Sequence, residues 1–134
     1  MRRYVLGWFG ATLCSLLCAT QGSAHHSFSA EYDANKPIAM MGTVTKLEWQ
    51  NPHTWFYIDV QDDAGKLVNW GMELASPNLL LRQGWTRSTL KIGDVVAVEG
   101  YGSKNGQNIG NARVIVLTAT GQRLVAGSSV ERTP

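Results

Sequence analysis

The chain has 134 residues, with 12 lysines and arginines against 10 aspartates and glutamates, and a formal net charge of +2. Two of the basic residues, Arg2 and Arg3, stand at its start, so the remainder carries ten side chains of each sign. This balance excludes a surface with clustered basic charge, and nucleic acid is therefore not an expected partner.

The first 24 residues have the pattern of a secretory signal peptide. Two arginines form a positive start, residues 5–19 are mostly apolar, and Gly22 and Ala24 are small residues that suit cleavage after Ala24. A retained membrane anchor is the alternative, but the apolar run is shorter than the roughly 18 residues that a spanning helix needs. We therefore expect a periplasmic or secreted protein with no stable membrane insertion after processing.

Cleavage after Ala24 leaves 110 of the 134 residues, which is the usual size of a single domain. Both cysteines lie in the signal, so the mature chain has neither a disulfide nor a thiolate ligand for a metal. We expect an extended segment at residues 25–40, a barrel at 41–120 and a tail at 121–134. Residues 122–124 of the tail are expected to add a last strand pairing.

Short β-type runs separated by turn residues fill the expected barrel, at residues 41–49, 54–61, 66–74, 95–101 and 112–118. In the second and third runs, the side chains alternate between two faces. The expected core face carries Thr54, Phe56, Ile58, Val60, Val68, Trp70, Met72 and Leu74. The expected outer face carries Trp55, Tyr57, Asp59, Gln61, Asn69, Gly71 and Glu73.

A helix is predicted at residues 76–84, between the third and fourth runs. Ser76 suits the N-cap, Pro77 suits the first helical position, and Gly84 suits the left-handed end. The OB-fold, a five-stranded Greek-key barrel, has this same order of three strands, a helix and then a hairpin. The predicted fold class is therefore all-β with one short helix and an OB-fold-like barrel, and an unrelated small β-sandwich is the alternative.

The histidines are the candidate metal ligands. After cleavage, His25 offers its α-amine and its ring nitrogen to one ion, and His53 supplies a second imidazole from a loop stiffened by Pro52. Three nitrogens suit Cu(II), whereas Zn(II) prefers a fourth ligand and a tetrahedral site. The sequence thus predicts a copper site among His25, His26 and His53. The rival geometry is a chelate made by His25 and His26 alone, without His53. The alternative role for His53 is to satisfy its turn by hydrogen bonding.

A second candidate site lies on the outer face of the second and third strands. The expected ligand-binding residues are Trp49, Asn51, Trp55, Tyr57 and Glu73. OB barrels bind oligonucleotides and oligosaccharides on this face. The alternative is that the N-terminal stretch with Phe28 and Tyr32 covers these aromatic side chains.

No hydrolytic constellation stands out, because the chain lacks a nucleophile elbow and has only His53 within the expected fold. We therefore expect a binding protein and not an enzyme. The leading hypothesis is an exported protein that holds copper, with an unidentified periplasmic protein or small ligand as its partner. The alternatives are a non-metal module for a glycan, small molecule or protein, and a structural accessory subunit.

Several motifs carry a resemblance to a known family: the run from His25 to Asp33 (HHSFSAEYD), the segment from Glu48 to His53 (EWQNPH), Ser76-Pro77-Asn78, and Leu90 to Asp94 (LKIGD). The chain resembles a family of small exported proteobacterial proteins classed as a domain of unknown function. The resemblance implies export and a single small domain. It implies no activity.

Overall fold

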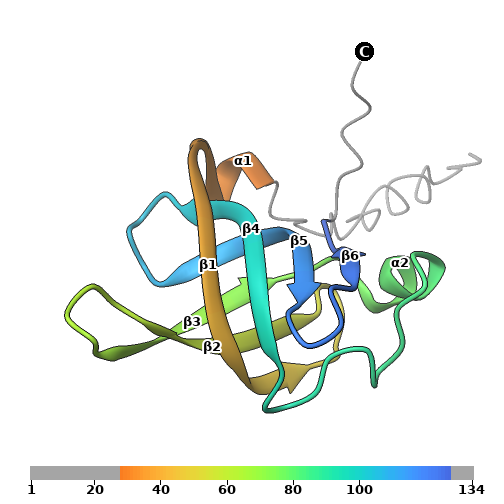
Figure 1. The fold of residues 1–134 in the computed structure, drawn as a ribbon. Helices are drawn as coiled ribbons and strands as arrows, with labels where there is room; N and C mark the ends of the chain where they lie inside the picture. The colour runs from red at the N-terminus through yellow and green to blue at the C-terminus, as the bar shows by residue number, and fades with distance from the viewer. Residues whose placement is uncertain (1–27, 128–134) are drawn as a thin grey trace, which may run out of the picture.

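The computed structural model describes residues 28–127, which form six strands and two short helices (Figure 1). In chain order, these are α1 Phe28–Glu31, β1 Tyr32–Glu48, β2 Trp55–Gln61, β3 Leu67–Glu73, α2 Pro77–Arg82, β4 Val95–Ser103, β5 Ile109–Leu117 and β6 Arg123–Val125. Within these residues, none of the helices is long and apolar enough to span a membrane. The proposed signal peptide, with His25 and His26 beyond it, lies outside the described residues.

Five of the strands close into a ring. β1 pairs antiparallel with both β2 and β4, and the hairpins β2–β3 and β4–β5 continue the sheet on either side. β3 and β5 then pair in parallel, with Gly71 opposite Ile109 and Glu73 opposite Asn111. β6 adds to the free edge of β5. The predicted fold class, all-β with the OB-fold strand order, is confirmed, although α1 is a second short helix that was not expected.

The core fills the inside of this ring, and the expected alternation of β2 is seen there. Phe56 and Ile58 are fully buried, as are Met72 in β3 and Leu74 just after it. β4 and β5 contribute Val96, Val98 and Ile115 from the opposite wall. Trp70 is only half-buried, although it packs against this core.

The first strand begins at Tyr32, nine residues before the expected start at Met41. Residues 33–37 are polar and include Pro37, so they read as a loop in the sequence. Strand pairing needs backbone groups and not apolar side chains, however, and Tyr32 and Pro37, at the two ends of this stretch, both pair with β4. Part of the expected N-terminal segment is therefore a wall of the ring.

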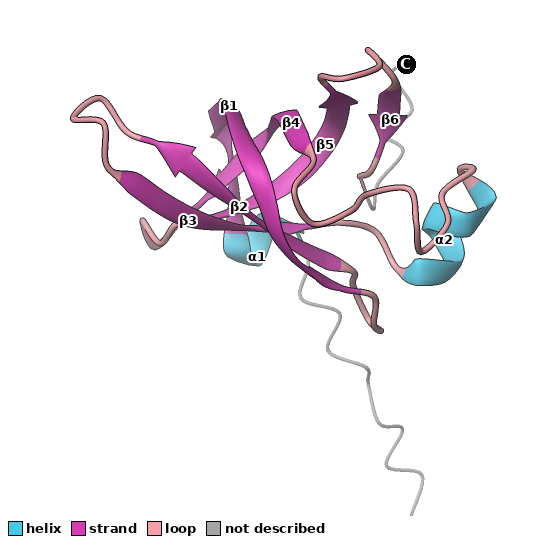
Figure 2. Ribbon diagram, turned by 60° about the horizontal axis from the view of Figure 1, so that its bottom comes forward, coloured by secondary structure: helices cyan, strands magenta, loops and turns pink. Residues whose placement is uncertain are grey.

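α2 and the end of the described chain support each other. Ser76 caps the helix through its hydroxyl, which accepts from the Leu79 amide, and Gly84 has the predicted left-handed conformation with φ of +90°. Trp85 is buried, and its indole N–H donates to the Val125 carbonyl at 2.8 Å. Figure 2 shows α2 on the same side of the ring as β6. Residues 123–127 of the expected tail thus pack on the ring beside α2.

Candidate functional site

A network of three side chains joins the β1–β2 connection to β3 and to the start of β1. His53 follows the cis peptide bond between Asn51 and Pro52, and its Nδ1 contacts Oε1 of Glu73. The hydroxyl of Tyr32 donates to Oε2 of the same carboxylate. Glu73 is 4% exposed and Tyr32 is 3% exposed, whereas 23% of the His53 side chain remains accessible. We call this group the His53–Glu73–Tyr32 network.

The network orients the imidazole of His53. Burial, together with the hydrogen bond and the charge of Glu73, raises the pKa of Tyr32, so its hydroxyl keeps its proton and remains a donor. A carboxylate oxygen only accepts, which assigns the proton of the contact with His53 to Nδ1. Nε2 is then the ring nitrogen left for another partner.

An aromatic cluster holds the beginning of the described chain against this network. Phe28 stacks on Tyr32 with ring centroids 5.7 Å apart and meets Tyr101 edge-on at 5.5 Å. The guanidinium of Arg113 lies 5.1 Å from the centre of the Phe28 ring and 5.5 Å from that of Tyr101. These contacts fix Phe28 beside Tyr32, whose hydroxyl belongs to the network.

No group of three or more His, Cys, Asp or Glu side chains among residues 28–127 is arranged to hold a metal ion. Of the predicted metal ligands, the structure describes His53 alone. His25 and His26 lie outside the described residues.

The second candidate site is a hollow of about 440 Å³ on the outer face of β2 and β3, which we call the aromatic hollow. Trp55 and Tyr57 line it from β2, and Asn69 and Gly71 line it from β3. The remaining lining residues are Glu48, Gln50, Asn108 and Ile109. Its volume falls in the range of roughly 300–1,000 Å³ that is usual for small-molecule sites.

Phe28 and Tyr32 do not cover the aromatic hollow. Neither residue lines the hollow, and their rings contact each other, Tyr101 and Arg113. Trp55 and Tyr57 are half-buried and line an open hollow. The alternative in which the N-terminal stretch covers these two side chains is therefore not seen for its described part, residues 28–40.

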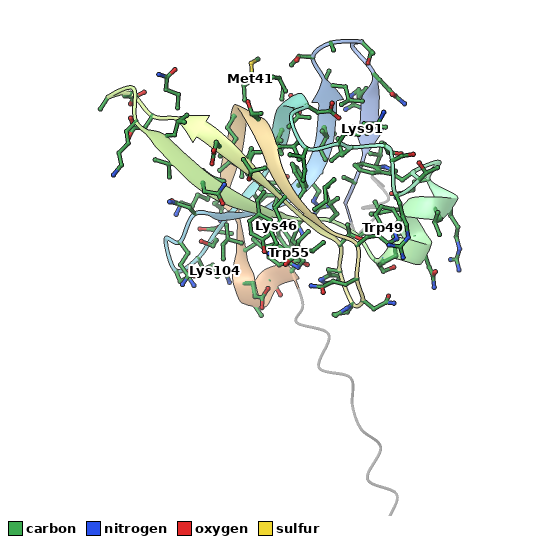
Figure 3. All side chains as sticks on the ribbon, turned by 90° about the horizontal axis from the view of Figure 1, so that it is seen from below. Met41, Lys46, Trp49, Trp55, Lys91 and Lys104 are labelled. Carbon is green, nitrogen blue, oxygen red and sulfur yellow. The ribbon has the colours of Figure 1, made fainter. Side chains whose placement is uncertain are left out.

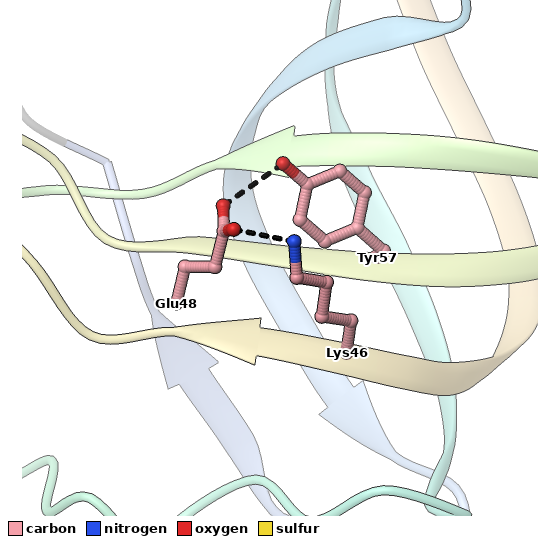
Figure 4. A network of polar contacts seen from close by, with 3 residues as sticks. All are labelled: Lys46, Glu48 and Tyr57. Carbon is pink, nitrogen blue, oxygen red and sulfur yellow. Dashed lines mark hydrogen bonds and ion pairs between the residues drawn. The ribbon is translucent and has the colours of Figure 1, made fainter.

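Two residues that line the aromatic hollow, Tyr57 and Glu48, form a polar group with Lys46 beside it (Figure 4). The Tyr57 hydroxyl donates to Glu48 Oε2 at 3.0 Å, and Lys46 Nζ lies 2.5 Å from Glu48 Oε1. The same ammonium lies 5.0 Å from the centre of the Tyr57 ring. The hydrogen bond that Lys46 donates is the main cause that lowers the pKa of Glu48, and the one from Tyr57 comes second. Glu48 in turn raises the pKa of Lys46.

The pKa of Tyr57 is expected to move in opposite directions in two charge-removing variants. It lies above the ordinary 10.0 because of partial burial first and then the hydrogen bond and charge of Glu48, while Lys46 lowers it. Glu48→Gln should therefore lower this pKa without returning it to the ordinary value, because burial remains. Lys46→Gln should raise it. Site-resolved NMR titration of the Tyr57 ring measures both, and shifts of equal sign would contradict the arrangement.

The structure separates the five predicted ligand-binding residues. Trp55 and Tyr57 line the aromatic hollow, whereas Trp49 packs against the core with the Arg87 guanidinium 5.9 Å from its ring centre. Figure 3 shows Trp49 toward α2 and apart from Trp55. Asn51 is exposed in the loop and does not line the hollow.

Glu73 is the correction to this set, because it was expected on an exposed outer face. The end of β3 pairs with β5 as well as with β2, and Tyr32 lies over the outer face at this point. Gly71, Met72 and Glu73 are consequently all buried, and the alternation of exposure is lost. Glu73 belongs to the His53–Glu73–Tyr32 network and not to the aromatic hollow.

Comparison with known proteins places the chain in a family. A family profile described as "Family of unknown function (DUF6152)" matches residues 13–112. The chain belongs to this family. The matched part of this DUF6152 member includes His25, His26 and the whole His53–Glu73–Tyr32 network, and it ends within β5. No curated protein matches the chain.

Sequence reasoning missed Tyr32, Tyr101 and Arg113 as parts of a site. Tyr32 lies in the polar stretch that was expected to be outside the ring, and Tyr101 and Arg113 lie in strands read only as walls. An aromatic side chain within so polar a segment as residues 29–37 was the available signal for Tyr32. The sequence contains no pattern that brings Arg113 next to Phe28, since that contact depends on the ring closure.

Proposed function

We propose that the processed protein is an exported Cu(II)-binding protein, in which His53 Nε2 and the amine and ring nitrogens of His25 hold the ion. The observation that supports this is the contact of His53 Nδ1 with the buried Glu73 carboxylate. Metal-binding histidines commonly donate their other ring N–H to a carboxylate, which fixes the ring and makes the free nitrogen more basic. Glu73 and Tyr32 then act as the outer shell of the site.

The reach of the chain is compatible with this ligand set. His25 precedes Phe28 by three residues, and three residues of extended chain span at most about 11 Å. Phe28 is stacked on Tyr32, which in turn contacts the carboxylate that holds His53. Signal cleavage after Ala24 supplies the free amine, so export and metal binding belong to one proposal.

Copper is the ion that this ligand set favours. Cu(II) accepts three nitrogens in a tetragonal arrangement, and the mature chain offers no thiolate that would favour Cu(I) or a zinc–sulfur site. The proposed role is storage, delivery or sensing of the ion, without a catalytic step.

Electron paramagnetic resonance of Cu(II) tests the ligand set. The protein is exported and processed in a bacterial periplasm, and mass spectrometry confirms that its N-terminus is His25. The expected wild-type spectrum shows three nitrogens. His53→Ala should change the hyperfine pattern and weaken binding by more than the roughly 10–100-fold loss that removal of an outer-shell partner causes. Glu73→Gln should fall within that range.

His26→Ala is the matched control, because His26 takes no part in the proposed set. An unchanged spectrum in this variant, combined with a changed spectrum in His53→Ala, supports the fold-built site. The reverse pattern would show that copper is held by the N-terminal peptide alone. In that case His53 has only a structural role and the proposal fails.

A further inference from the structure

The shape of the aromatic hollow depends on Gly71, which has no side chain. A Cβ atom at this position would lie 3.2 Å from Cε1 of Tyr57 and 3.6 Å from Cζ3 of Trp55. The two rings therefore pack directly over the backbone of β3. Gly71 is the floor of the hollow, and the rings are its sides.

The polar side chains of the hollow are free to bind a ligand. Within residues 28–127, the side-chain amides of Gln50 and Asn108 and the indole N–H of Trp55 make no hydrogen bond. Asn69 uses its Nδ2, which donates to Asp59 at 2.8 Å, and this leaves its Oδ1 as an acceptor. Donors and acceptors thus stand beside exposed aromatic surface.

The charges of the hollow select against anionic ligands. Among the described residues that line it, Glu48 is the one charged side chain, and its carboxylate is already bound by Tyr57 and Lys46. Phosphate and polyanion sites instead depend on unpaired basic groups. A ligand for this hollow should therefore be uncharged, with a flat apolar face and several hydroxyl groups.

We propose that the aromatic hollow binds a neutral saccharide. The C–H face of a sugar ring packs against the electron-rich faces of Trp55 and Tyr57, and the amides of Gln50 and Asn108 hydrogen-bond to its hydroxyls. This inference goes beyond copper binding, because it uses none of the proposed metal ligands. It holds or fails independently of the metal site.

NMR titration of the processed protein in the presence of EDTA tests the proposal. The probes are maltotetraose, cellotetraose and tetra-N-acetylchitotetraose, with a ten-nucleotide oligothymidine as the anionic comparison. At least one saccharide at millimolar concentration should shift the indole N–H signal of Trp55 and the amide signals of Gly71 and Asn108. The oligothymidine should leave these signals unchanged, and the His53→Ala variant should bind the saccharide as the wild type does.

Two asparagines give a matched pair of variants, because both are exposed and the side chain of neither makes a hydrogen bond in the described part of the chain. Asn108→Ala should weaken saccharide binding about threefold to tenfold, as expected for loss of a hydrogen bond. Asn78→Ala, in α2, should have no effect. Trp55→Ala should abolish binding. Absence of shifts with all three saccharides, shifts outside the hollow, or equal effects of both asparagine variants would overturn the proposal.

Discussion

Gly100→Ala is expected to lower the free energy of unfolding by about 3 kcal/mol. A Cβ atom at this position would lie 2.0 Å from the carbonyl oxygen of Asn111 and 3.0 Å from its carbon, both of which belong to the backbone of β5. A backbone segment paired on both sides cannot move aside as a flexible side chain does. The close approach arises at a bulge, because Glu99 pairs with Val114 while Gly100 pairs with Ala112.

Urea denaturation of the processed protein, followed by tryptophan fluorescence and circular dichroism, measures this loss. Gly102→Ala is the matched control in the same strand. Its Cβ would meet the Lys36 and Ile38 side chains at 3.3 and 3.4 Å, and both can shift, so the expected cost stays below about 1 kcal/mol. Equal stability of the two variants would contradict the bulge geometry.

Tyr32→Phe is expected to destabilise the protein by about 1.5–3 kcal/mol near neutral pH, because it removes a hydrogen bond to a buried carboxylate. The ring itself is kept, and so is its stacking on Phe28. Tyr101→Phe is the control, since the Tyr101 hydroxyl makes no hydrogen bond among residues 28–127. It should cost much less, as measured by the same urea denaturation.

The difference between wild type and Tyr32→Phe should also depend on pH in the alkaline range. Burial and Glu73 raise the pKa of Tyr32 above the ordinary 10.0 at which an unfolded tyrosine ionises. The folded protein therefore holds the Tyr32 proton more tightly than the unfolded chain does. The resulting stabilisation is fully present below pH 10 and is lost as the pH rises from 10 toward the raised pKa. The wild type should lose up to about 1.4 kcal/mol more per pH unit than the variant. Equal pH dependence of the free energy of unfolding of the two proteins from pH 9 to 11 would contradict the raised pKa of Tyr32.

Much of the fold could be predicted because its signals are local. The alternation of Phe56 and Ile58, the Ser76 cap and the left-handed Gly84 depend on neighbouring residues alone, and all were found as expected. The predicted strand began at Ala112, because Gly110 and Asn111 are turn-type residues in the sequence. In the structure, β5 begins at Ile109. Gly110 and Asn111 lie in a strand since β3 and β4 pair with them from both sides.

The candidate sites were predicted only in part, for the same reason. The aromatic pair Trp55 and Tyr57 follows from two-residue alternation within one strand, and the structure places both in the hollow. The burial of Glu73 depends on Tyr32, which is 41 residues away in sequence. Contacts of this kind follow from the register of the closed ring, and no local pattern encodes that register.

The parallel pairing of β3 with β5 is expected to form after the two hairpins, and both candidate sites depend on it. The β2–β3 and β4–β5 hairpins each join strands close in sequence, whereas Gly71 meets Ile109 across 38 residues, so this contact carries the larger entropic cost of loop closure. Gly71 and Ile109 line the hollow, and Glu73 in the same pairing holds His53. A folding intermediate that has both hairpins but an open ring lacks both sites, so ligand capture reports the final closure.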